Sequence, residues 1–147
     1  MIRTRVGVCG FDPVLVKGYV TSGGAPSGRA LFWYLPFEVW EDYKPEPQEK
    51  IVGTVDAIYD YEAKKVAEPK EKFEWNLSPE TGLCVVLPPE FIKKYKLTEF
   101  HFLEMTLEEL VRKNGKRVEL YPNKEVTSKK FWPIERMKLH YYLRYVE

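Results

Sequence analysis

Apolar and polar residues alternate most regularly between Ile51 and Tyr61. On an extended chain, one face would carry Val55, Ala57, Tyr59 and Tyr61, and the other would carry Asp56, Ile58, Asp60 and Glu62. A period of two residues is typical of a β-strand with one buried face. The sequence therefore predicts a strand over residues 51–61, with its tyrosine-bearing face in the core.

Shorter apolar runs bounded by Gly, Pro, Asn or Asp predict further strands, because these residues end pairing or favour turns. The predicted strands cover residues 2–8, 14–20, 30–35, 73–75, 83–87, 100–105, 117–121 and 137–146. In the last of these, alternation places Lys138, His140, Tyr142 and Arg144 on the outward face.

Three segments have the features of short helices. Residues 37–43 and 89–96 carry apolar side chains at helical spacing, and the second begins at a proline that suits the first helical position. Thr106 followed by Glu109 matches a capping box, which predicts a third helix ending near Gly115.

Many short strands, two or three short helices and no regular alternation of the two favour a β-rich α+β fold. We expect a mainly antiparallel sheet or a partly open barrel. The stretch 76–82 is the best boundary within the 147 residues. It would separate an N-terminal β-rich lobe (1–75) from a C-terminal α+β lobe (76–147), although one continuous domain also fits this length.

The segment VVLPPEFIKKYKL, residues 85–97, combines a short strand, two prolines, a short basic helix and a leucine, and a predicted strand follows up to residue 105. This order resembles the half-motif of the AbrB-type swapped-hairpin DNA-binding family. The resemblance covers residues 85–105 and no other part of the chain. It departs from the family at Thr98-Glu99, where the family has a Gly-Asp turn. The resemblance implies DNA binding through this segment.

The net charge of +1 gives no overall attraction to nucleic acid, but the charge is unevenly distributed. Residues 1–75 have a net charge of −2 and residues 76–147 a net charge of +3, so an anionic partner would prefer the second half. One Gln and three Asn stand against 45 charged side chains, a composition that predicts a thermophilic source.

Two patterns share features with known catalytic motifs. Residues 21–29 have the glycine spacing of a phosphate-binding loop but lack its Lys and Ser/Thr, so a simple hairpin loop is expected. Glu62-Ala63-Lys64 matches the Glu-x-Lys of metal-dependent nucleases, for which Asp42, Asp56 or Asp60 would supply a second carboxylate. Solvated surface charges are the expected interpretation of this second pattern, because Glu and Lys are abundant.

The two cysteines and two histidines lack the paired spacing of zinc ligands. They are Cys9, Cys84, His101 and His140. We expect two buried free thiols, while a disulfide stays open as an alternative. The sequence predicts no catalytic residue, no metal site and no cofactor.

We expect a cytoplasmic, non-enzymatic nucleic-acid-binding or regulatory protein that self-associates as a homo-oligomer. Its contact residues would be basic and aromatic side chains of the C-terminal half, namely Lys93, Lys94, Lys96, Lys138, His140, Tyr142 and Arg144. The first alternative is an accessory protein that binds a protein partner through exposed aromatic residues. The second is a small metal-dependent nuclease using Asp56, Asp60 and Glu62. No apolar run reaches 18 residues, so no membrane span is predicted.

Overall fold

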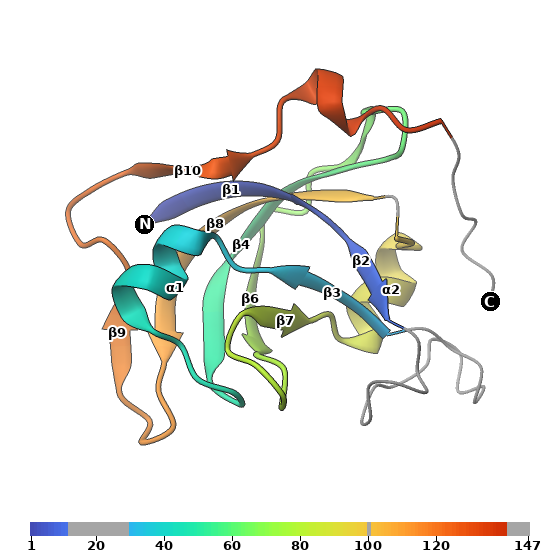
Figure 1. Cartoon of the computed structure of the whole chain (residues 1–147). Coiled ribbons are helices and arrows are strands. Elements are labelled where there is room, and N and C mark those ends of the chain that lie inside the picture. The colour runs from blue at the N-terminus through green and yellow to red at the C-terminus, as the bar shows by residue number, and fades with distance from the viewer. Residues whose placement is uncertain (12–29, 100, 141–147) are drawn as a thin grey trace.

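Two β-sheets and two short helices surround one main apolar core in the computed structural model, which describes residues 1–11, 30–99 and 101–140 (Figure 1). The elements are β1 (Ile2–Gly7), β2 (Cys9–Phe11), β3 (Ala30–Tyr34), α1 (Phe37–Tyr43), β4 (Lys50–Tyr59), β5 (Lys65–Ala67), β6 (Glu71–Asn76), β7 (Cys84–Val86), α2 (Pro89–Tyr95), β8 (Phe102–Val111), β9 (Arg117–Glu119), β10 (Val126–Phe131) and the 3-10 helix η1 (Ile134–Met137). The core draws apolar side chains from both sheets and both α-helices.

The larger sheet follows the strand order β10-β1-β8-β4-β5, with β6 also paired to β4 and β9 also paired to β8. All of these pairs are antiparallel except β1 with β10. The sheet is mixed and does not close into a barrel. It also takes strands from both sides of the 76–82 segment.

The smaller sheet has the order β2-β3-β7 and lies over the core from the opposite side (Figure 1). The chain passes from the larger sheet to the smaller one at Val8, whose amide donates to the His101 carbonyl oxygen at 2.8 Å. A β-rich α+β fold is therefore confirmed, in the form of two sheets.

Most of the predicted elements are present. Helices α1 and α2 lie where helical spacing predicted them, and strands form within seven of the predicted segments. The predicted strand 14–20 lies outside the described residues. Among the residues that the structure describes, no helix has the length and apolar character needed to cross a membrane.

The predicted helix beginning at Thr106 is wrong, because β8 runs through it as one strand of 10 residues. Leu103, Met105 and Leu107 are buried in alternation along β8, which pairs with both β1 and β4. The ladders on both edges of β8 stabilise the extended chain more than the capping motif stabilises a helix. Thr106 Oγ1 instead donates to Asp56 Oδ2 across the sheet at 2.7 Å.

The predicted strand 137–146 is also wrong in its described part. Met137 is buried as predicted, but it ends η1, and only an isolated bridge follows, between Lys138 and Glu62. Pro133 at the start of η1 fixes a backbone angle that suits a helical turn.

The predicted burial of Val55, Ala57 and Tyr59 in strand 51–61 is confirmed, but these side chains do not all face the same core. The pairing of β4 with β8 shifts register between Val55 and Ala57, and such a bulge reverses the face on which later side chains lie. Ile58 therefore joins the main core, whereas Ala57 and Tyr59 pack in a second cluster with Met137. Tyr61 is only half-buried.

A buried ion pair ties the loop after α1 to the end of β8. Glu49, with 3 % of its surface exposed, accepts a bond of 3.0 Å from Arg112 and one of 3.1 Å from the Lys113 amide. Arg112 also donates to the Tyr43 and Lys44 carbonyl oxygens. Burial alone would raise the pKa of Glu49, but hydrogen bonds from the Glu46 amide, Arg112 and the Lys113 amide outweigh burial and lower it.

We predict that Arg112→Leu lowers the free energy of unfolding at pH 7 by about 2–4 kcal/mol, because it leaves the Glu49 carboxylate buried without its cation. Glu49 has a lowered pKa in the folded state, so its contribution is complete above its unfolded pKa of about 4.3 and is lost as the pH falls below that value. Urea titrations between pH 7 and pH 3 should show a weaker loss of stability on acidification in the variant.

Lys113→Ala is the matched control, because Lys113 forms an exposed ion pair with Glu46 at 3.5 Å and should change stability by less than about 1 kcal/mol. Equal stability losses in the two variants would contradict the stabilising role of the buried Glu49–Arg112 pair.

Candidate binding groove

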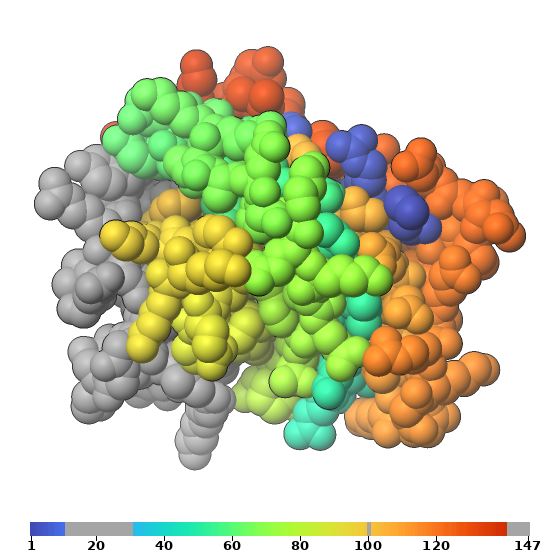
Figure 2. All heavy atoms as spheres, turned by 180° about the vertical axis from the view of Figure 1, so that it is seen from behind, coloured from blue at the N-terminus to red at the C-terminus, as the bar shows by residue number. Residues whose placement is uncertain are grey.

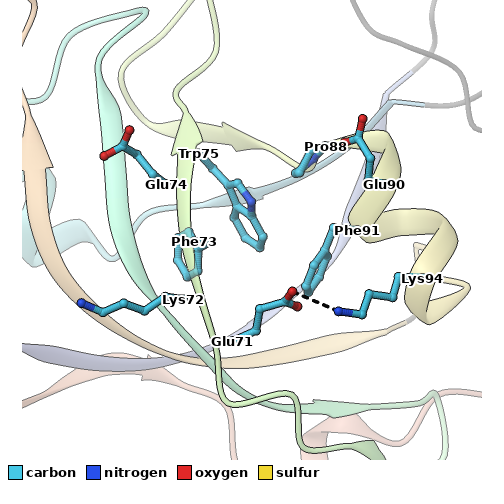
Figure 3. A pocket seen from close by; sticks show the side chains of 9 residues that line it. All are labelled: Glu71, Lys72, Phe73, Glu74, Trp75, Pro88, Glu90, Phe91 and Lys94. Atoms are coloured by element: carbon cyan, nitrogen blue, oxygen red, sulfur yellow. Dashed lines mark hydrogen bonds and ion pairs between the residues drawn. The ribbon is translucent and has the colours of Figure 1, made fainter.

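A groove of about 550 Å³ lies between β6 and α2 (Figure 3). Seen from behind, β6 and α2 lie side by side on the surface, in light green and yellow (Figure 2). The residues that line the groove are Glu71, Lys72, Phe73, Glu74, Trp75, Pro88, Glu90, Phe91 and Lys94. This volume falls within the usual range of ligand pockets, about 300–1,000 Å³.

The local sequence explains why an open groove forms here. Among the described strands, β6 has β4 as its single ladder partner, so its other edge is left beside α2. Alternation turns Phe73 and Trp75 to the buried side of β6. The paired prolines 88 and 89 end β7 and start α2, and one turn of helix then places Phe91 against Trp75.

Three aromatic rings form the floor of the groove. Phe73 and Trp75 stack with ring centroids 3.9 Å apart, and Phe91 meets Trp75 edge-on at 4.9 Å. Trp33 of β3 supports both β6 rings from the core side at 6.5 and 6.4 Å. Because the floor is packed against the core, its geometry is set before any ligand arrives.

The rim of the groove carries charges that are mostly neutralised by neighbours. Lys94 binds Glu71 at 3.0 Å, and Lys72 binds Glu108 at 3.3 Å. On the opposite side of β6, Glu74 binds Arg117 at 2.8 Å and Lys50 at 3.8 Å.

Glu90 differs from these residues. Within the described part of the chain, no cation lies within ion-pair distance of its carboxylate, which is exposed in the first turn of α2. Phe91 near the start of α2 packs against Trp75, and Lys94 near its end binds Glu71, so the groove has an acidic residue, Glu90, at the start of α2 and a neutral pair at the other end. Figure 3 shows the Glu90 carboxylate pointing away from the Trp75 ring.

The structure places the predicted contact residues at separate points. Lys93 and Lys96 are exposed on α2, while Lys94 is engaged by Glu71. Lys138 and His140 are exposed beyond η1, next to the β4–β5 turn. Tyr142 and Arg144 lie outside the described residues.

Much of the positive charge predicted in the C-terminal half is neutralised. Arg112, Lys113 and Arg117 all bind carboxylates, as does Lys94. Lys130 turns inward and is half-buried. A count of charges along the sequence therefore overstates the basic surface of this half.

The predicted nuclease carboxylates have other contacts. Asp56 accepts from Thr106 at 2.7 Å, and Asp60 accepts from the Glu62 and Lys64 amides in the β4–β5 turn. Asp42 accepts from the Tyr121 hydroxyl at 2.6 Å. In the described ranges, no three His, Cys, Asp or Glu side chains gather in a way that could hold a metal ion. The predicted glycine loop 21–29 lies outside the described residues.

Both cysteines are free thiols. Cys9 is in β2 and Cys84 is in β7, with β3 between them. Neighbouring strands are about 4.8 Å apart, so two strand spacings exceed the Cα separation of about 7 Å that a disulfide tolerates. The expectation of free thiols is confirmed, although Cys9 is only half-buried.

Sequence reasoning identified the strand at 73–75 and the apolar side of residues 89–96, but it did not bring them together. The signals were the alternation of Phe73 and Trp75 and the paired prolines that orient α2. The sequence pattern does not contain the pairing of β6 with β4, which is a contact between distant parts of the chain.

Comparison of the chain with protein families, curated proteins and solved structures finds no match.

The floor of the groove depends on a close approach at Gly53 of β4. Gly53 lies opposite Phe73 in the β4–β6 ladder and opposite Leu107 in the β4–β8 ladder. A methyl group at this position would stand 2.5 Å from the Thr106 carbonyl oxygen and 2.9 Å from Phe73 Cζ. Only glycine lets the three strands meet at this spacing with Phe73 folded over β4.

We predict that Gly53→Ala destabilises the fold by about 1–3 kcal/mol, because the added methyl group overpacks this contact and displaces Phe73. Chemical denaturation would measure the loss, and near-ultraviolet circular dichroism would report the disturbed aromatic cluster. Gly7→Ala is the control, since a methyl group there would meet Phe102 at an ordinary 3.5 Å. An unchanged aromatic spectrum in Gly53→Ala would contradict this account of the floor.

Proposed function

We propose that this chain is a cytoplasmic, non-enzymatic binding protein whose β6–α2 groove receives an extended basic segment of a protein partner. The observation that carries the proposal is that Glu90 lines a groove with a preformed aromatic floor and has no cation at ion-pair distance among the described residues. The groove thus joins an apolar surface to an uncompensated negative charge.

Charge complementarity selects the occupant. Phosphate groups would be repelled at the Glu90 end, whereas an Arg or Lys side chain would find a carboxylate there. A cation that lies over an aromatic face gains about 0.5–2 kcal/mol, and tryptophan is the best of the aromatic rings for this contact. Trp75 is 7 % exposed, so a ligand would meet only part of its ring.

The shape of the site favours an extended peptide. Aromatic-lined grooves take extended, proline-containing segments because these lose little conformational entropy on binding. The open edge of β6 runs along the groove and ends near the Glu71–Lys94 pair. A site of this size holds one or two side chains, so we expect dissociation constants of about 1–100 μM.

The first test uses an array of seven-residue proline- and alanine-based peptides that differ only at the central residue, which is Arg, Lys, Gln or Glu. The wild type should prefer Arg and Lys over Gln, and Gln over Glu. Glu90→Lys should lower the affinity for the Arg peptides by about five- to tenfold and remove this preference, because it replaces the carboxylate with a cation that repels the Arg side chain of the peptide.

The variant should fold, since loss of an acidic residue from the first helical turn costs at most about 1 kcal/mol. Glu41→Lys is the matched control: Glu41 is likewise exposed and helical, but it belongs to α1. The proposal would be contradicted by peptide affinities that do not depend on the charge of the central residue. It would also be contradicted if Glu90→Lys still preferred the Arg and Lys peptides.

A second candidate function is nucleic-acid binding through the outward side of α2. The supporting observation is that Lys93 and Lys96 are exposed and have no ion-pair partner within the described residues. Phosphate contacts by such lysines would supply sequence-independent affinity that falls with salt. The resemblance of residues 85–105 to the AbrB-type family supports the same surface.

Replacement of Lys93, Lys94 and Lys96 by Ala should reduce the slope of log affinity against log salt by about 2.7 on duplex DNA, because each lost phosphate contact contributes about 0.9. Stability should change by less than about 1 kcal/mol, since the three side chains are exposed and, within the described ranges, Lys94 alone of the three has an ion pair. Fluorescence anisotropy with labelled duplex and single-stranded DNA measures the slope. If the wild-type protein binds neither DNA at low salt, nucleic-acid binding is excluded as a function and peptide binding in the groove is the candidate that stays.

A further inference from the structure

A second cluster of reactive side chains lies on the three-stranded sheet, away from the groove. In the ladders of β3, Cys9 is opposite Phe32 and Cys84 is opposite Tyr34. Residues two apart share a face, so both cysteines and Tyr34 lie on one face of this sheet. The other face, with Trp33 and Val85, is fully buried in the main core.

Lys130 reaches this face from the larger sheet. Its backbone in β10 is fixed by two bonds: its carbonyl oxygen accepts from Thr4 Oγ1 at 2.8 Å, and its amide donates to Ser128 Oγ at 2.9 Å. The ammonium nitrogen lies 5.0 Å from the centre of the Tyr34 ring. Lys129, the preceding residue, is exposed.

The charge of Lys130 is not balanced by an acid among the described residues. Within the described part of the chain, no carboxylate is at ion-pair distance from its ammonium group. Burial lowers the pKa of Lys130, and the neighbouring Cys9 and Cys84 offset this only in part. An unpaired, half-buried lysine has more neutral amine at a given pH than an exposed one.

The two thiols behave in the opposite way. Burial raises the pKa of Cys9, and it raises the pKa of Cys84 to about 11. A thiol is a nucleophile only as the thiolate, so both cysteines are largely unreactive near neutral pH. Lysine, rather than cysteine, is therefore the activated nucleophile of this cluster.

We propose that Lys130 is a carbonyl-binding amine, which takes small aldehydes as a Schiff base against the Tyr34 ring. The neutral amine adds to the carbonyl carbon, and the carbonyl π electrons move to the oxygen, which takes a proton. The resulting carbinolamine loses water to give the imine, with no oxidant or reductant involved. The ring of Tyr34 stabilises the protonated imine as it does the ammonium group.

The test treats the folded protein with pyridoxal and, separately, with acetaldehyde, traps the imine with cyanoborohydride and locates the modified lysines by peptide mass spectrometry. Lys130 should be modified faster than Lys129. As the pH is raised, the modification rate of Lys130 should reach its plateau at a lower pH than the rate of Lys129. Lys130→Arg keeps the charge and the ring contact, so it should fold and lose the fast-reacting site.

Tyr34→Leu provides a second readout, because it keeps the amine but removes the ring. It should reduce the fraction of Lys130 trapped at equilibrium with aldehyde while leaving modification of Lys129 unchanged. Equal modification of Lys130 and Lys129 in the wild type, or fast labelling that persists in Lys130→Arg, would overturn the proposal. Protection of Lys130 in the folded protein, with reaction only after denaturation, would overturn it as well.

Discussion

The meeting of three strands at Gly53 is the constraint on which the rest of the structure depends. β4 pairs with β8 along one edge and with β6 along the other, and the missing side chain lets β8 and Phe73 approach its backbone closely. With Phe73 folded over Gly53, Trp75 stacks on Phe73 and Phe91 of α2 packs against Trp75. The groove floor is thus an extension of the central ladder.

Local patterns predicted most of the elements but failed where distant pairing decided the outcome. The capping motif at Thr106 is a real helix signal, yet β8 gains ladders with β1 and β4 by remaining extended. Likewise, a strict alternation cannot reveal the bulge after Val55, which moves Ile58 into the main core and Tyr59 out of it. The deciding contacts join residues about 50 positions apart in the β4–β8 ladder and about 100 apart in the β1–β8 ladder, and a single-sequence pattern does not contain them.

The same limit applies to charge. The positive excess of the C-terminal half predicts a basic surface, but Lys94, Arg112 and Arg117 bind carboxylates from the N-terminal half. Conversely, Glu90 looks ordinary in the sequence, and only the fold shows that it lines the same groove as Trp75. Ion pairs between the two halves thus neutralise part of this basic segment, while Lys93 and Lys96 stay exposed without an ion-pair partner among the described residues.

The proposed peptide groove places the partner on the face formed by β6 and α2. Backbone amide hydrogen exchange, followed with and without a saturating basic peptide, tests this claim without altering the chain. Binding at the groove predicts added protection in residues 71–76 and 88–95, with little change elsewhere, because bound backbone and its neighbours open less often. Protection centred on α1, β10 or the segment after η1, with residues 71–76 unchanged, would contradict the account.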